Sequence, residues 1–115
     1  EFGSHSQYHE ILTELSRFEL EKTVKGSIND IEEIISESVR SFSYPNGNFN
    51  YEIMKLLQDS KIEFAFTTHD DLFSGKYTLL NIPRIAVGGY DEIDMFRSNL
   101  NGTIRCFNNV KNAIK

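Results

Sequence analysis

The chain has 115 residues, of which 39% are hydrophobic and 25% are charged, a composition typical of one globular domain spanning residues 1–115. Its 17 acidic and 12 basic residues give a net charge of −5, which argues against binding to nucleic acid or to an anionic membrane surface. No apolar run approaches the roughly 20 residues of a membrane-spanning helix, and no signal peptide is visible. The single cysteine, Cys106, excludes an internal disulfide and a cysteine-based zinc site.

The first half of the chain predicts a helix, a strand and a second helix. Residues 10–15 indicate a loop or a short helical turn, and Ser16 and Glu19 then have the spacing of a capping box that opens a helix over residues 17–36. Alternating large and small side chains predict a strand over residues 39–44. A turn and a helix over residues 51–60, capped by Asn50, follow.

The second half of the chain predicts two further strands and a helix. The apolar residues 62–68 indicate a buried strand, and the polar residues 69–77 indicate a loop. A strand over residues 82–87 precedes a helix over residues 92–100 that we expect Asp91 to cap. The tail, residues 103–115, is compatible with a strand and a helical turn.

This alternation predicts an α/β fold in which a parallel sheet is flanked by helices. Parallel sheets carry their chemistry at the carboxyl ends of the strands. Four polar segments with the sequences SHS, YPNG, TTHDD and VGGY occur at or just after such ends. Site residues are therefore expected in these four segments.

His5 and His9 are four residues apart, so on a helical turn they would lie on one face and could bind one metal ion. Catalytic zinc sites use three protein ligands and a water, which means that a third ligand has to come from elsewhere. The alternative is a pair of surface histidines near the end of the chain. Spacing alone favours the surface pair.

The segment RSFSYPNG can form a strand followed by a turn whose backbone N–H groups face an oxyanion, and Arg40 could hold a carboxylate. The alternative is a plain Pro-Gly turn beside an exposed arginine. In the next polar segment, His69, Asp70 and Asp71 are interpreted as solvated loop residues. The aromatic residues of the two strands are interpreted as core rather than as sugar-binding platforms; they are Phe42, Tyr44, Phe64 and Phe66.

In this order and at this separation, the segments EFGSHSQYH and RSFSYPNGNFN resemble two motifs of the polysaccharide deacetylase family, the NodB-homology domain. The first is similar to the H-[ST]-x-x-H metal motif, and the second is similar to the arginine and Tyr-Pro-x-Gly motif. The later segments LLQDSKIEFAFTTHDDLFSG and LNIPRIAV are similar to the strand and loop segments of the carboxyl-terminal part of that family. The resemblance extends over residues 1 to about 100.

The resemblance implies a distorted (β/α) barrel that removes N- or O-acetyl groups from acetylated cell-surface polysaccharides with a divalent metal, usually zinc. It implies that His5 and His9 bind the metal and that Arg40 orients the catalytic base. The backbone N–H of Tyr44 would bind the oxyanion, in a loop formed with Pro45, Asn46 and Gly47.

Two family motifs are not recognisable in this chain. The paired aspartates that supply the base and the third metal ligand would precede residue 1, and the late Leu-x-His motif of the general acid has no match. His69 is the remaining histidine and a candidate substitute acid. We therefore expect the later half of a partial barrel, inactive alone, that associates with itself or with the missing half. The alternative is a non-catalytic carbohydrate-binding or assembly domain. The compartment, bacterial cell envelope or cytoplasm, stays open.

Overall fold

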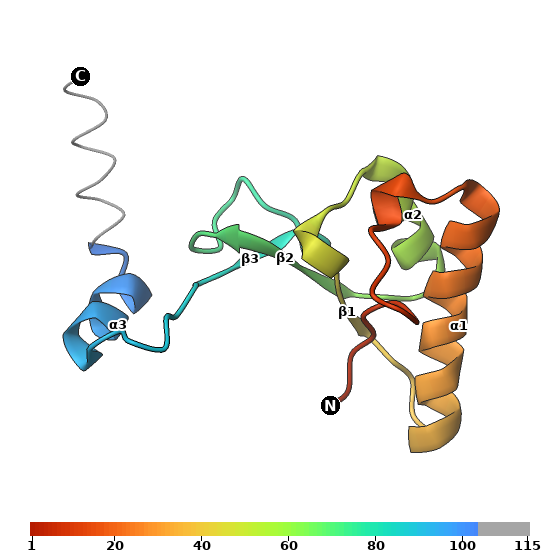
Figure 1. The fold of residues 1–115 in the computed structure, drawn as a ribbon, viewed down its shortest axis with the longest axis horizontal. Helices are drawn as coiled ribbons and strands as arrows, with labels where there is room; N and C mark the ends of the chain where they lie inside the picture. Colours follow the sequence, from red (N-terminus) through yellow and green to blue (C-terminus); the bar gives the residue numbers. More distant parts are fainter. Residues whose placement is uncertain (104–115) are drawn as a thin grey trace.

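The computed structural model describes residues 1–103. These residues form a parallel sheet with helices packed beside it, in an order given by two short 3-10 turns (η), the α-helices and the strands (Figure 1). The elements are η1 (Leu12–Glu14), α1 (Arg17–Ile35), β1 (Ser41–Ser43), η2 (Pro45–Gly47), α2 (Tyr51–Asp59), β2 (Phe64–Asp70), β3 (Ile82–Arg84) and α3 (Ile93–Leu100). The predicted order of helices and strands is confirmed over these residues.

Side chains at the helix starts explain where α1 and α2 begin. The hydroxyl of Ser16 accepts a hydrogen bond from the N–H of Glu19, and the Glu19 carboxylate accepts one from the N–H of Ser16, which completes the predicted capping box. Asn50 caps α2 by accepting a 2.9 Å hydrogen bond from the N–H of Ile53. Helix α1 ends at Ser36, which adopts a left-handed conformation.

The sheet has the strand order β1-β2-β3, and both neighbouring pairs are parallel. Ser41, Phe42 and Ser43 pair with Phe64, Ala65 and Phe66 in register. Ser4 adds an isolated parallel bridge to Phe42, so the N-terminal segment lies along the free side of β1. The predicted parallel α/β sheet is confirmed.

The hydrophobic core lies where α1 and α2 pack against one face of the sheet. Phe42 and Ala65 point to this face and are buried, whereas their strand neighbours Phe64 and Phe66 are only partly buried. The core contains Leu12, Leu20, Val24, Ile28, Val39, Phe42, Tyr44, Ile53, Leu57, Ile62 and Ala65. Burial of these side chains is the main stabilising contribution that fixes the sheet on the helices.

Several predicted boundaries are wrong. Strand β2 extends to Asp70, so His69 and Asp70 belong to the strand and not to a loop. Strand β3 ends at Arg84, because the chain then leaves the sheet and the N–H of Ala86 donates to the Asp70 carboxylate at 3.0 Å. Asp91 does not cap α3, since its carboxylate accepts a 2.7 Å hydrogen bond from the N–H of Gly88.

Helix α3 lies apart from the sheet and has no buried residue (Figure 1). None of the helices in the described part of the chain is both long and apolar enough to cross a membrane. The strand and helical turn expected over the tail, together with Cys106, lie outside the described residues apart from Thr103.

Candidate functional site

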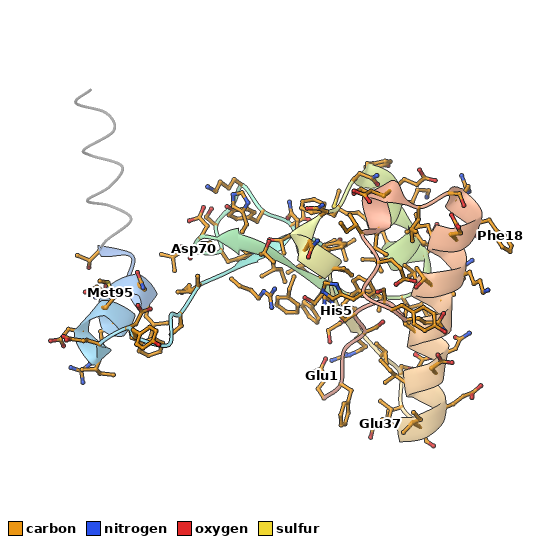
Figure 2. All side chains as sticks on the ribbon, in the orientation of Figure 1. Glu1, His5, Phe18, Glu37, Asp70 and Met95 are labelled. Atoms are coloured by element: carbon orange, nitrogen blue, oxygen red, sulfur yellow. The ribbon has the colours of Figure 1, made fainter. Side chains whose placement is uncertain are left out.

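The two histidines come together through a loop and not through a helical turn as expected. Residues 5–9 are not helical, and Ser6 and His9 have left-handed backbone angles, with φ of 61° and 60°. The loop nevertheless brings the two imidazole rings edge to face, with 4.8 Å between their centroids. Figure 2 shows His5 beside the sheet, near the centre of the molecule. The structure therefore brings the two imidazole rings together, as the spacing predicted, but through a loop and not through a helical turn.

A backbone hydrogen bond sets which nitrogen of the neutral His5 ring carries the proton. Nδ1 of His5 lies 2.6 Å from the carbonyl oxygen of Ser43, the last residue of β1. Because a carbonyl oxygen only accepts hydrogen bonds, Nδ1 has to carry the proton. The neutral ring then has an unprotonated Nε2, which is the form that binds metal ions, and the backbone fixes its direction.

Polar contacts with α1 hold the histidine loop in place. The N–H of Gln7 donates to Thr23 Oγ1 at 3.2 Å, and the Gln7 side chain donates to Asp30 at 2.9 Å. Ser4, directly before His5, shares a buried 2.7 Å hydrogen bond with Ser27. These contacts tie the loop to α1.

Glu10, just after the loop, is the acceptor for Thr23, whose hydroxyl donates to the Glu10 carboxylate at 2.8 Å. Partial burial opposes ionisation of Glu10. Hydrogen bonds from backbone N–H groups and from Thr23 outweigh this effect and hold the pKa of Glu10 below its ordinary value. Glu10 is therefore a charged anchor of the loop.

The turn over residues 44–47 follows β1 at the same edge of the sheet as His5. The N–H of Tyr44 donates to the carbonyl oxygen of Phe66 at 3.0 Å, so it is not the free oxyanion donor that the resemblance implied. The N–H of Gly47 is engaged with the Tyr44 carbonyl at 2.9 Å, and Pro45 has no N–H. Within residues 1–103, the hydrogen bonds of this turn leave the N–H of Asn46 as the available donor.

Thr68 of β2 fixes the shape of this turn. Its hydroxyl donates to the carbonyl oxygen of Asn46 at 3.1 Å. Asn46 and Gly47 both have left-handed backbone angles, with φ of 54° and 76°. A Cβ on Gly47 would approach the Thr68 hydroxyl and would lie 2.7 Å from the Thr68 backbone nitrogen, which explains why glycine is needed here.

The Tyr44 side chain is structural. It is fully buried, stacks on Phe49 with 5.1 Å between ring centroids, and donates from its hydroxyl to the Leu80 carbonyl at 2.7 Å. Burial raises the pKa of Tyr44 above its ordinary value. Tyr44 therefore supports the turn from the hydrophobic core, and its hydroxyl is not exposed.

Arg40 lies away from the two histidines. Arg40 precedes β1 at its amino end, whereas His5 contacts Ser43 at the carboxyl end. The Arg40 guanidinium instead pairs with Glu63 at 3.4 Å. Three residues of strand separate the two ends by about 10 Å.

Arg84, at the carboxyl end of β3, is the arginine that sequence reasoning did not assign. Its Nε donates to the Thr67 carbonyl at 2.8 Å, and its side chain is exposed. Arg17, Arg40 and Arg97 each pair with a carboxylate, whereas no ion pair of Arg84 is present among residues 1–103. No signal in the sequence marked this place, because Arg84 lay inside the predicted strand over residues 82–87, whereas β3 ends at Arg84.

His69 stays separate from the histidine pair. It occupies the carboxyl end of β2 and packs edge to face on Tyr77, with ring centroids 6.3 Å apart. No cluster of three or more His, Cys, Asp or Glu side chains that could hold a metal ion occurs in the described part of the chain. His5 and His9 therefore offer two donors, which fits part of a zinc site.

A family model of polysaccharide deacetylase matches residues 1–65, which include the histidine loop, β1 and the turn that follows it. No curated protein matches the chain at a significant level. The matched residues are those that assemble the features described above.

Solved structures share the fold. The deacetylase PplD of Streptococcus pyogenes, in complex with acetate, is 18% identical with a TM-score of 0.81, and the match covers 86% of this chain and 44% of PplD. A polysaccharide deacetylase from Bacillus cereus is 22% identical with a TM-score of 0.75, over 86% of this chain and 31% of that protein. The BpsB deacetylase domain of Bordetella bronchiseptica is 18% identical with a TM-score of 0.56, over 64% of this chain and 29% of that one. The chain thus spans less than half the length of these similar structures.

Proposed function

Because the chain belongs to the polysaccharide deacetylase family, we propose that it supplies part of a metal-dependent centre that hydrolyses acetyl groups, mainly N-acetyl groups, of a cell-surface glycan. The observation that carries this proposal is the pairing of His5 and His9, with the His5 ring oriented by the Ser43 carbonyl. Metal-binding histidines usually donate a hydrogen bond of this kind from the ring nitrogen that does not bind the metal.

His5 and His9 are the proposed metal ligands, and zinc is the metal that suits two imidazoles in a hydrolase. Zinc bound there would polarise the acetyl carbonyl and lower the pKa of a bound water. The third ligand and the catalytic base would come from chain outside residues 1–103, in line with the short span of the match.

The chain's own residues contribute binding and orientation. The N–H of Asn46 would donate to the oxyanion that forms on the acetyl carbonyl, in a turn that Thr68 and Gly47 hold rigid. Arg84, at the carboxyl end of β3, would contact the carboxylate of the catalytic base, the role that the resemblance gives to Arg40. His69 stays the proposed substitute for the general acid.

A protein partner is also part of the proposal. Phe64 and Phe66, on the sheet face opposite the core, are only partly buried, and the Ser4 segment and β3 are the outer members of the sheet. Open edges and apolar surface of this kind favour pairing with another chain or segment. We propose that a second copy or the remaining part of a barrel covers this face.

Zinc binding measured by calorimetry on the 115-residue chain tests the proposal. His5→Ala and His9→Ala are each expected to abolish measurable binding. His69→Ala and Arg40→Ala are matched controls that should keep the affinity of the wild type, because neither residue lies at the pair. Binding that survives loss of either His5 or His9 would contradict the assignment.

The second candidate function is a non-catalytic carbohydrate-binding or assembly domain. It is supported by the finding that only two metal donors gather within residues 1–103. Glycan binding that persists in His5→Ala and His9→Ala, without acetate release from an acetylated glycan by the complete protein, would favour this candidate. Acetate release that requires zinc would exclude it.

A further inference from the structure

The loop between β2 and β3, which we call the aromatic loop (residues 71–77), is tied together by Asp71. The Asp71 carboxylate lies 2.6 Å from Nζ of Lys76 and accepts a 2.7 Å hydrogen bond from the Tyr77 hydroxyl. It also accepts a 2.8 Å hydrogen bond from the N–H of Leu72. A loop with this many internal contacts presents its side chains in a fixed arrangement.

The aromatic loop exposes an aromatic surface. The ring of Phe73 is 55% exposed although it stacks on Tyr77, with 6.5 Å between centroids and an interplanar angle of 25°. Nζ of Lys76 lies 5.0 Å from the centre of the Tyr77 ring. The Phe73 ring is therefore bordered by Tyr77, which in turn contacts the ammonium of Lys76 and the carboxylate of Asp71.

The charges of this surface are balanced. Hydrogen bonds from Lys76 and Tyr77 hold the pKa of Asp71 well below its ordinary value, so the carboxylate stays ionised beside its ammonium partner. A surface without net charge does not select an anion or a cation. It offers one apolar face with donors and acceptors at its border, which matches a sugar ring with its C–H face and its hydroxyl groups.

The position of the aromatic loop places it beside the proposed catalytic edge. It directly follows β2, whose Thr68 contacts the turn that carries Asn46. Ser43, which contacts His5, pairs with Phe66, and Asp70 ends β2 four residues further along the same strand, on the order of 13 Å away. A polymer lying along this end of β2 would therefore reach both places.

We propose that the aromatic loop is a sugar-binding subsite, in which Phe73 stacks on a pyranose ring of the glycan next to the sugar that carries the acetyl group. Asp71 and Lys76 contact the hydroxyl groups of that ring. This inference rests on the proposed function only for the choice of glycan as ligand. The subsite needs neither metal nor the histidine pair.

The test is a titration of the 115-residue chain with N-acetylglucosamine tetramers, in β-1,4 and in β-1,6 linkage, in the presence of EDTA, followed by NMR. Phe73→Ala is expected to weaken binding of at least one tetramer about threefold to tenfold, as loss of one aromatic contact predicts. Phe73→Tyr retains an aromatic ring and is expected to bind the tetramer as tightly as the wild type. Phe18→Ala is the matched control, since Phe18 is 78% exposed on α1 and far from the sheet edge (Figure 2).

Three outcomes would overturn the sugar-binding subsite. Absence of binding by both tetramers, equal binding by the wild type and Phe73→Ala, or equal weakening in Phe18→Ala would overturn the subsite. Because EDTA removes zinc, this result is independent of the catalytic proposal. Sugar binding that is unchanged in His5→Ala would support the subsite even if zinc binding and acetate release were absent.

Discussion

The proton on Nδ1 of His5 is donated to the carbonyl oxygen of Ser43 across 2.6 Å, so the ring direction is set by the end of a β-strand. Ser4, one residue earlier, is bridged to Phe42 of the same strand and bonded to Ser27 of α1. The sheet and the helix therefore fix the direction of the ring whose Nε2 is the proposed metal ligand. This preorganisation means that zinc affinity should respond to residues that never touch the metal.

Thr23→Val tests this preorganisation. Thr23 is buried and is hydrogen-bonded both to the N–H of Gln7 and to the Glu10 carboxylate, so valine removes one hydrogen bond from each of these partners. We expect the free energy of unfolding to fall by about 1–3 kcal/mol. Zinc affinity should fall about tenfold because the loop loses one of its anchors to α1. Urea unfolding and zinc calorimetry measure the two effects.

Thr78→Val is the control for this change, since Thr78 is exposed in a turn away from the histidines. It should leave zinc affinity unchanged. A second check is NMR relaxation of residues 5–9 in protein treated with EDTA, where the loop should stay as ordered as the rest of the sheet. Loss of order in the loop after chelation would mean that zinc, and not α1, orders it.

Gly47→Ala tests the turn that carries Asn46. Alanine at φ 76° is strained, and its Cβ would lie 2.7 Å from the Thr68 backbone nitrogen. We expect a loss of stability of about 1–3 kcal/mol, measured by urea unfolding. Gly75→Ala is the matched control, because nothing lies within 4 Å of its Cβ position and its stability should change by less than about 1 kcal/mol. Equal effects of the two substitutions would contradict the role of the Thr68 contact.

Local signals in the sequence predicted the helices well. Capping by Ser16, Glu19 and Asn50 acts within three residues, so it can be read without knowing the rest of the fold. Strand ends were less predictable, because they depend on partners far along the chain. Strand β3 stops at Arg84 since Ala86 bonds to Asp70, 16 residues earlier.

In the candidate site too, features set by local sequence were predicted and features set by distant contacts were not. The pairing of His5 and His9 was found from spacing and from the family motif, although the helical geometry first assumed was wrong. Arg40 was assigned from the family motif, and it lies at the amino end of β1, away from the histidines, where it pairs with Glu63. The engagement of the Tyr44 N–H by Phe66 is a contact between neighbouring strands that no local pattern reveals.

Tyr44→Phe tests the buried support of the turn and its pH dependence. The Tyr44 hydroxyl donates to the Leu80 carbonyl at 2.7 Å inside the core, so its loss should cost about 1–3 kcal/mol at neutral pH. Burial raises the pKa of Tyr44 in the folded state above the ordinary value near 10, which stabilises the fold below pH about 10 and is lost as the pH rises further. The wild type should therefore lose stability above pH about 10 more steeply than Tyr44→Phe.

Tyr51→Phe, at a position 77% exposed, is the control. It should lose stability at alkaline pH as the wild type does, and its free energy of unfolding at neutral pH should change by less than about 0.5 kcal/mol. Urea unfolding at neutral pH and at two alkaline pH values separates these outcomes, and an equally steep alkaline loss in Tyr44→Phe would show that Tyr44 is not the group responsible.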